Sequence, residues 1–575
     1  MFLRLALLNF NSSRYLNLIG SVKRSLKIMK DIFFLSLLFG GITAFSFTLT
    51  RVEKSDAPKA WRDNNLVVED VTAVTEAVDA AFAKDWLFRG LSHAEQVNNL
   101  LVARRISLGI AGTIPSLAEI RELELQPESE QIDWWLTRLL EDRRTSNYLA
   151  ERLTRALVGV EDGPFLIFRR RRFVSWLSDE LFLNRPYDEL VSEILTEEGL
   201  WTDTPAVNFY TRTIAQGEES NKPDPVLLAG RTSRAFLGMR IDCLQCHDDF
   251  LDSVALGDAE DLRSGTQRDF HSLAAFFSDV ESSLLGIRDL NEHSPYEYQL
   301  LDEEKASVVV PRVPFHRELD GKEANQRVRL AKWVTHKENR PFARAAVNRV
   351  WAIMFGRGLI NPVDEIPLGG PFPEALEILT DDFVSHGYDL HRLIRVIGST
   401  QALKLNSAAD FTVTQSHENA IAVFPTIRLR PEQVAGAIGQ STSLTTINSG
   451  SHITTRLMKF GQQNEFVSRF GDPGEDEFSD RGETVTQRLL MLNGEMVGER
   501  LENVFNAPSH LASLAPDLDT AVDVIYLTTL TRYPNEDERQ KAVGWLSEQG
   551  RQQRGQEVID LYWSLLNSSE FRWNH

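Results

Sequence analysis

The chain has 575 residues, of which 42% are apolar and 25% are charged, a composition typical of a soluble globular protein with two or more domains. Its net charge of −20 argues against a nucleic-acid partner, because a polyanion needs clustered lysine and arginine to displace its counterions. With only two cysteines the chain is not a disulfide scaffold, so apolar burial must hold its core.

The N-terminal segment has the pattern of an export signal. Basic residues between positions 23 and 30 precede an uncharged apolar run over 32–49, and the small residues Ala44 and Ser46 allow cleavage. We expect residues 1–50 to be a signal peptide, with an uncleaved membrane anchor as the alternative, since the run is about long enough to span a bilayer. Met29 directly precedes this run and is a candidate for the true start. The protein is therefore expected to be periplasmic or secreted, with no membrane contact beyond this anchor.

Apolar residues then recur at helical spacing through the first half of the chain. Pro115, followed by acidic residues, indicates a helix start, and Pro186 separates two helices because proline cannot continue one. A further helix begins near Asp224 and runs into the cysteine pair. The other expected helices span residues 94–110, 132–142 and 147–160.

Helical periodicity is lost between about Ser283 and Pro314, where the stretch Val308–Phe315 is compatible with a short strand interrupted by prolines. It returns in Phe342–Phe355, which Gly356 ends, and continues towards the C-terminus. The small, polar stretch Gly436–Arg456 is expected to be a mobile excursion.

The sequence therefore predicts a mainly α protein with two helical domains. The first covers residues 60–282 and the second covers residues 326–575. An irregular connection that can include β-structure, residues 283–325, joins them.

Both cysteines lie in one short motif, Cys243-Leu244-Gln245-Cys246-His247. The pattern C-x-x-C-H is the attachment motif for c-type haem. Two thiols one helical turn apart can each add to a vinyl group on one porphyrin edge, and the following histidine can then ligate the iron. We expect Cys243, Cys246 and His247 to hold haem c, for electron transfer or a haem-assisted oxidation.

Other interpretations of the motif stay open at this point. The cysteines can bind zinc or iron together with His247 and either Asp248 or Asp249, although a closed structural zinc site usually has four Cys or His ligands. They can instead form a redox disulfide, or be inert thiols. A sixth haem ligand is not identified; the candidates by residue type are Met239, His271, His293 and Met354.

Polar residues of the second domain form a further group with two interpretations. They can cap helices and form buried ion pairs that stabilise the domain, which we favour. They can instead line a polar pocket for an anionic or sugar ligand that faces the cysteine domain. The group consists of Asn348, Arg349, Arg357, Asp364, Arg428, Arg430 and Glu432.

Several segments together resemble a known family. The segments "SRAFLGMRIDCLQCHDDF" and "LNRPYDELVSEILTEEG" resemble the planctomycete cytochrome-c-like domain, domain of unknown function 1549. The segments "NRPFARAAVNRVWAIMFGRGLINPVDEI", "DDFVSHGYDLHRLIRVIGST" and "TVTQRLLMLNGEMV" resemble its usual companion, the planctomycete-secreted domain of unknown function 1553. The order and number of these segments carry the assignment.

The resemblance implies an exported protein named for its C-x-x-C-H motif. Its members often occur beside sulfatase-like proteins, which implies a link to polysaccharide metabolism, with sulfatase-like or polysaccharide-degrading proteins as partners. The haem hypothesis predicts an unknown redox partner instead. The family pattern continues Cys-x-x-Cys-His-x-His-Pro, whereas this chain has Asp249 and Phe250 in the last two places. The departure removes an expected metal ligand and leaves the three haem-binding residues intact.

Overall fold

The fold is described from a computed structural model of the chain. The predicted signal peptide or anchor, residues 1–50, lies outside the described residues. None of the helices in the part that the structure describes is both long and apolar enough to cross a membrane. The described residues are 68–575 apart from 162–167, 215–221, 259–260, 291, 449–450, 452–464, 472–473, 475–477, 479–483, 494–496, 498–514 and 548–553.

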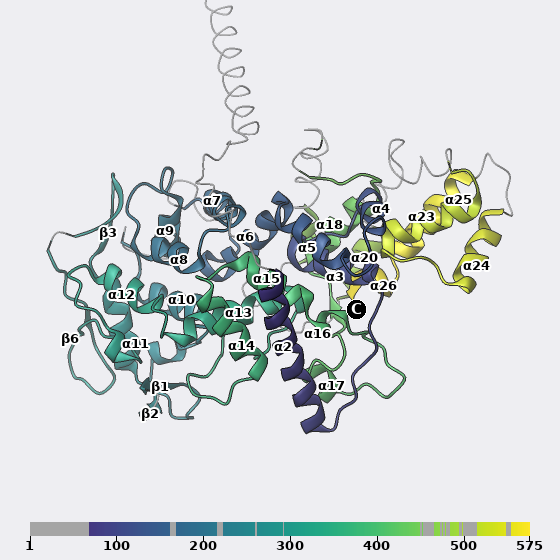
Figure 1. The fold of residues 1–575 in the computed structure, drawn as a ribbon. Helices are drawn as coiled ribbons and strands as arrows, with labels where there is room; N and C mark the ends of the chain where they lie inside the picture. Colours follow the sequence, from purple (N-terminus) through teal and green to yellow (C-terminus); the bar gives the residue numbers. More distant parts are fainter. Residues whose placement is uncertain are drawn as a thin grey trace, which may run out of the picture. The chain divides into compact units, whose positions relative to one another are not determined.

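The first half consists of helices with short connections (Figure 1). Local sequence sets their ends: Ser116 forms a capping box with Glu119 at the start of α4 (Leu117–Glu124), and the side chain of Asp224 caps α10 (Pro225–Leu237). The predicted break at Pro186 is confirmed. The other helices are α2 (Val68–Arg89), α3 (Asn99–Ala111), α5 (Gln131–Leu140), α6 (Arg143–Val158), α7 (Arg170–Phe182), α8 (Tyr187–Thr196), η2 (Pro205–Val207), α9 (Asn208–Ile214), η3 (Asp242–Gln245), α11 (Gln267–Ala274) and η4 (Ala275–Phe277).

Short antiparallel hairpins follow α10 and extend into the connection. The predicted strand over Val308–Phe315 is only the two-residue β6, because Pro311 and Pro314 have no N–H group to donate to a neighbouring strand. The pairs are β1 (Ala255–Asp258) with β2 (Asp261–Ser264), β3 (Val280–Ser283) with β4 (Gly286–Asp289), and β5 (Glu297–Tyr298) with β6 (Ser307–Val308).

The second half is again helical, so the prediction of a mainly α protein is confirmed. A last two-stranded sheet pairs β7 (Ile427–Arg428) with β8 (Trp573–Asn574). The helices are η5 (Arg317–Leu319), α12 (Gln326–Val334), α13 (Arg340–Phe355), α14 (Glu374–Ser385), α15 (Leu390–Ser399), α16 (Gln401–Lys404), α17 (Gln415–Asn419), α18 (Pro431–Ser441), α20 (Val485–Asn493), α23 (Leu518–Leu530), α24 (Glu536–Ser547), α25 (Arg554–Leu566) and α26 (Ser569–Arg572).

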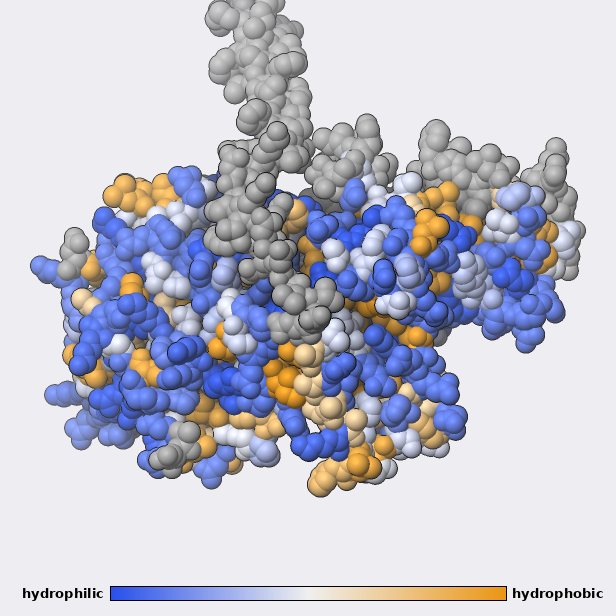
Figure 2. All heavy atoms as spheres, in the orientation of Figure 1, coloured by the Kyte–Doolittle hydropathy of each residue, from blue (hydrophilic) through white to orange (hydrophobic). Residues whose placement is uncertain are grey.

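One hydrophobic core runs through both halves of the described chain. It contains Trp135 and Phe236 from the first half and Trp351 from the second, and α10 packs against α13. A second core joins Leu108 of α3 to α18, α23 and α25. The connection between the two sequence domains therefore does not divide the core. The face of the described chain seen in Figure 2 is mostly hydrophilic, with apolar residues in small groups.

Arg104 of α3 extends its guanidinium group into the interior of the second half. Arg104 is 1% exposed; its Nη1 donates to the carbonyl of Thr529 at 2.9 Å and its Nη2 to that of Phe571 at 3.3 Å. Burial lowers the pKa of Arg104 to about 10, so the group stays charged at neutral pH.

The neighbouring Arg105 contacts a different segment of the second half. Its Nη1 donates to the carbonyls of Leu403 and Leu405 at 2.6 and 2.7 Å, and its guanidinium carbon lies 3.8 Å from the ring centroid of Phe424. Burial lowers its pKa to about 9. Both charges depend on acceptors that the second half supplies.

Glu432 of α18 forms a buried ion pair with α6. Its Oε1 accepts from Arg152 Nη2 at 2.8 Å and from Arg155 Nη2. Burial alone would raise the pKa of Glu432, but the two arginines lower it to about 2. Glu432 therefore joins the two sequence domains, which agrees with the ion-pair interpretation.

The prediction of a mobile excursion over Gly436–Arg456 is wrong for its first residues, because α18 continues to Ser441. A Cβ atom on Gly436 would lie 2.3 Å from the carbonyl oxygen of Gly112, and that carbonyl belongs to the turn that ends α3. The small residue is needed for close packing of helix against turn. Of the remainder, residues 449–450 and 452–456 lie outside the described residues.

Replacing Glu432 with Gln is expected to lower the free energy of unfolding by about 3–5 kcal/mol, since it removes the buried carboxylate charge that Arg152 and Arg155 share. The folded-state pKa lies below the ordinary value of 4.5, so this stabilisation is full above about pH 5 and is lost as the pH falls towards 2. Thermal unfolding of both proteins across this pH range is the measurement. The control is Glu374→Gln, because the exposed Glu374–Lys84 pair should contribute less than about 1 kcal/mol. A difference that does not change with pH would contradict the assignment.

Candidate functional site

The C-x-x-C-H motif forms a short 3₁₀ turn, η3, directly after α10. The backbone N–H of Cys246 donates to the carbonyl of Cys243 at 3.2 Å. Side chains at positions i and i+3 of a 3₁₀ helix lie on the same side. Cys243 lies in η3 and Cys246 is its C-cap, and both are exposed free thiols. We therefore expect the turn to present the two thiols close to one another at the surface.

Leu244 anchors this turn in the core. Its side chain is fully buried, and a Cβ atom on Gly265 would lie 2.6 Å from Leu244 Cδ1. The glycine thus leaves room for the leucine under the turn. The motif therefore has an apolar anchor between two exposed thiols.

The carbonyl of Gln245 fixes the middle of the motif. It accepts from Gln267 Nε2 at 3.1 Å, from His271 Nε2 at 3.1 Å and from the hydroxyl of Tyr298 at 3.4 Å. Gln267 and His271 lie on α11, and Tyr298 lies on β5 in the connection. Sequence reasoning did not identify Gln267 or Tyr298, because a backbone acceptor leaves no pattern in the sequence.

His271 supports the turn and is not available as a sixth ligand in this arrangement. Because a carbonyl only accepts, Nε2 carries the proton, and Nδ1 accepts from the hydroxyl of Tyr296 at 2.9 Å. The ring stacks on Tyr298 with centroids 3.5 Å apart, and burial lowers the pKa of His271. It is therefore a neutral, fully bonded core histidine.

The other sixth-ligand candidates are also engaged elsewhere. Met239 and Met354 are buried in the core, and Met354 packs against Gly109 of α3. His293 is paired with Asp279 through Nδ1 at 2.6 Å. None of them is brought to the cysteine turn by a contact within the described residues.

His247 is exposed and held in one tautomer. Its Nδ1 donates to the carbonyl of Asp248 at 2.7 Å, so Nε2 carries the lone pair. A histidine that ligates a metal usually donates its other ring N–H in this way. The Phe250 ring stacks against the imidazole with centroids 6.1 Å apart, and Phe250 and Leu251 are 78% and 87% exposed.

Asp249 organises the loop that carries Phe250. Its carboxylate accepts from the N–H groups of Val254 at 2.6 Å and Leu251 at 3.1 Å, and from Ser253 Oγ at 3.0 Å. These bonds, that of Val254 first, lower the pKa of Asp249. The carboxylate of Asp249, which would be a ligand in the alternative zinc or iron site, is thus already hydrogen-bonded within its own loop.

The charges near the thiols do not favour a thiolate. Partial burial, and then the carboxylate of Asp249, raise the pKa of Cys243. A reactive dithiol needs a nearby cation or a helix N-terminus that lowers this pKa. Across the part of the chain that the structure describes, no three Cys, His, Asp or Glu side chains are grouped as a metal site.

The polar residues of the second domain are engaged in structural contacts. Asn348 Nδ2 donates to the carbonyl of Ile360 at 2.9 Å and its Oδ1 accepts from the N–H of Ile360 at 3.0 Å, which fixes the turn after α13. The others bond as follows: Arg430 to Tyr148, Arg357 to Asn419, Arg428 to Gln487, Arg349 to the carbonyl of Arg234, and Asp364 to Arg234 and Arg240.

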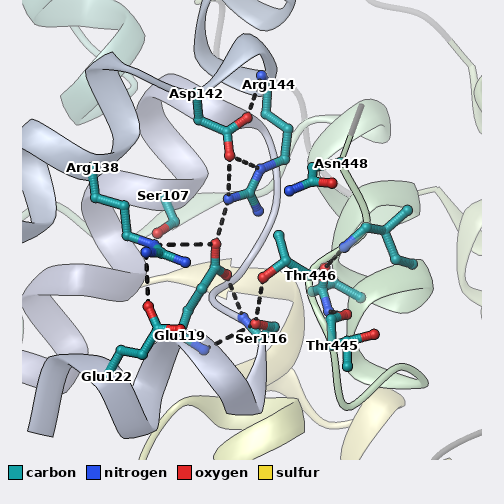
Figure 3. Close-up of polar contacts among 12 residues, drawn as sticks. Ser107, Ser116, Glu119, Glu122, Arg138, Asp142, Arg144, Thr445, Thr446 and Asn448 are labelled. Carbon is teal, nitrogen blue, oxygen red and sulfur yellow. Dashed lines mark hydrogen bonds and ion pairs between the residues drawn. The ribbon is translucent and has the colours of Figure 1, made fainter. Parts of the chain in front are cut away.

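A second polar cluster surrounds Glu119 (Figure 3). The carboxylate of this fully buried residue accepts from the N–H of Ser116 at 2.8 Å and from Arg144, while Arg138 lies 3.9 Å away. The hydroxyls of Ser116 and Thr446 lie 2.9 Å apart. The cluster fixes a helix start to a loop of the second half, a structural role.

Two family models match the chain in the order that the sequence predicted. Residues 77–282 match the family described as a protein of unknown function, DUF1549 (PSCyt2), and residues 326–546 match another, DUF1553 (PSD1). The chain belongs to the family in which these two domains follow one another. No curated protein and no solved structure matches it. The cysteine turn lies in the DUF1549 domain, and Asp364 lies in the DUF1553 domain.

Replacing Asp249 with Ala is expected to loosen the loop beside His247, because three hydrogen bonds lose their acceptor. The amide protons of Leu251 and Val254 should then exchange with solvent faster, whereas those of α11 should not. Hydrogen-exchange mass spectrometry on the full chain is the measurement, with the exposed Asp261→Asn as control. Unchanged exchange at these two amides would contradict the role given to Asp249.

Proposed function

We propose that the protein is an exported c-type cytochrome-like protein that carries haem on Cys243 and Cys246, with His247 as axial ligand. The observation that carries the proposal is the arrangement of these three side chains. Two exposed thiols lie three positions apart at a 3₁₀ turn that contains Cys243 and has Cys246 as its C-cap. The next residue is an exposed histidine whose Nδ1 donates to a carbonyl.

The residues present fit this group. Thioether attachment needs two accessible thiols at this spacing, and iron ligation needs a histidine Nε2 with a free lone pair. Phe250 and Leu251 supply exposed apolar surface directly beside His247. When bound, the haem would supply one-electron exchange.

Hydrogen bonds within the chain fix the backbone around the motif in the absence of a cofactor. Gln267, His271 and Tyr298 hold the carbonyl of Gln245, which fixes the backbone between the thiols. Asp249 holds the loop that places Phe250 against the His247 ring. Preorganised side chains reduce the conformational entropy lost on binding.

The alternatives receive less support from the same geometry. Zinc or iron would have to bind without Asp249, whose carboxylate is engaged within its own loop. The carboxylate ligand would then have to come from Asp248, whose Oδ1 already accepts from the N–H of Gln267 at 2.7 Å. A redox disulfide is disfavoured by the raised pKa of Cys243. The predicted periplasmic or secreted location and the polysaccharide-degrading or redox partners stay predictions.

Producing the full chain in a bacterial host with haem-attachment machinery tests the proposal. We expect a Soret band and covalent haem on the intact protein by mass spectrometry, both lost in Cys243→Ser/Cys246→Ser. His247→Ala should retain attached haem but shift its ligand-field spectrum, because the axial nitrogen is gone. The control is His293→Ala, an exposed histidine away from the turn. A wild-type protein without covalent haem would refute the proposal, and zinc or iron retained in its place would favour the metal alternative.

A further inference from the structure

The turn that carries the cysteines is held on its N-terminal side by the DUF1553 domain. Helix α10 ends at Gly238, which has a left-handed φ of 62°. A Cβ atom at this position would lie 3.0 Å from Ile366 Cδ1 and 3.1 Å from Ala345 Cβ. The carbonyl of Gly238 also accepts from the N–H of Ile366 at 2.8 Å. The end of the helix is thus packed directly against the other sequence domain.

One carboxylate ties this helix end to the segment that leads into the motif. Asp364 Oδ2 accepts from Arg234 Nε, on the last turn of α10, at 3.0 Å. The same carboxylate accepts from Arg240 Nη2, three residues before Cys243, at 3.2 and 3.3 Å. Burial alone would raise the pKa of Asp364, but Arg234 and Arg240 lower it, so the group is ionised at neutral pH.

Further contacts from the same domain support this carboxylate. Arg349 of α13 donates through Nη2 to the carbonyl of Arg234 at 3.4 Å, and Glu365 Oε1 lies 3.6 Å from Arg240 Nε. The C-terminal side of the turn is held separately, through the carbonyl of Gln245. The two sides therefore depend on different parts of the chain.

We infer that the DUF1553 domain completes the cofactor site, and that Asp364 is a positioning residue that fixes the relative placement of Cys243 and Cys246 through Arg240. The domain acts on the site through the backbone that leads into the turn. The inference deepens the proposed function, on which its consequence for haem attachment rests, but the thiol geometry can be measured without haem.

The affinity of the reduced full-length chain for phenylarsine oxide tests this inference. A trivalent arsenical binds tightly only where two thiols lie close together, so its dissociation constant reports their placement. We expect Asp364→Asn to weaken binding about tenfold, the effect of losing the preorganisation of a few side chains. Arg240→Gln, which leaves the Arg234–Asp364 pair in place, should weaken binding in the same direction. The double variant should add little to either single change, because both remove one contact.

The matched control is Asp382→Asn. Asp382 forms a buried pair with Arg392 at 2.7 Å within the DUF1553 domain, so its loss destabilises the protein without touching the cysteine turn. The control should lower the melting temperature and leave arsenical binding unchanged. If Asp364→Asn does not fold, Arg240→Gln alone decides the question.

Unchanged arsenical binding in Asp364→Asn and Arg240→Gln would overturn the inference, and so would equal weakening in Asp382→Asn. These outcomes are independent of the haem result. A wild-type protein without haem whose arsenical binding depends on Asp364 would refute the proposed function and retain the positioning role. A chain that acquires haem, but whose haem-free reduced form binds the arsenical regardless of Asp364, would support the proposed function and refute the positioning role.

Discussion

Arg104 and Arg105 bring two charged groups into the interior of the protein on adjacent positions of one helix. A buried charge is tolerated only where acceptors surround it, and here the acceptors are carbonyls of Thr529, Leu403 and Leu405. All three lie in the second half of the chain. The DUF1549 domain alone therefore cannot supply the hydrogen-bond acceptors that these two guanidinium groups of α3 need. We therefore expect the folding of one sequence domain to depend on the other.

The same dependence recurs around the cysteine turn. Asp364 of the DUF1553 domain holds the segment before the motif, and Tyr298 of the connection holds its middle. The exposed thiols and His247 thus lie on a rigid support contributed by all three regions. The proposed cofactor site thus draws on residues from the whole chain, and the inferred role of the DUF1553 domain is to position a site that lies outside its own sequence.

The sequence was informative where chemistry has a short local pattern. Pro186 indicated a helix break, which the structure confirms. The spacing of Cys243 and Cys246 indicated two thiols one helical turn apart, and the structure places Cys243 in η3 with Cys246 as its C-cap. Packing between residues far apart in the chain could not be predicted from the sequence. Gly436 was interpreted as part of a mobile excursion, because nothing local shows that its missing side chain accommodates the turn at Gly112.

Polar residues were the hardest to interpret from sequence. Asp249 is a metal ligand by residue type, yet its carboxylate closes a local loop. Asp364 belonged to a group for which buried ion pairs were the favoured interpretation, and the structure confirms this with Arg234 and Arg240 as its partners. In both cases the residue type showed that a carboxylate would accept hydrogen bonds or bind a cation. Only the structure identified the groups that it contacts. The partners of backbone carbonyls, such as that of Gln245, have no sequence signal at all.

The central claim is that both sequence domains share one core on which the cysteine turn depends. Pulse-labelling hydrogen exchange of the full chain across a urea series tests it directly. We expect α3, α10 and α13 to lose protection at the same urea concentration, since the buried arginines and the Asp364 contacts couple them. Protection that persists in α13 after α3 and α10 have exchanged would show that the domains unfold independently, and would contradict the account.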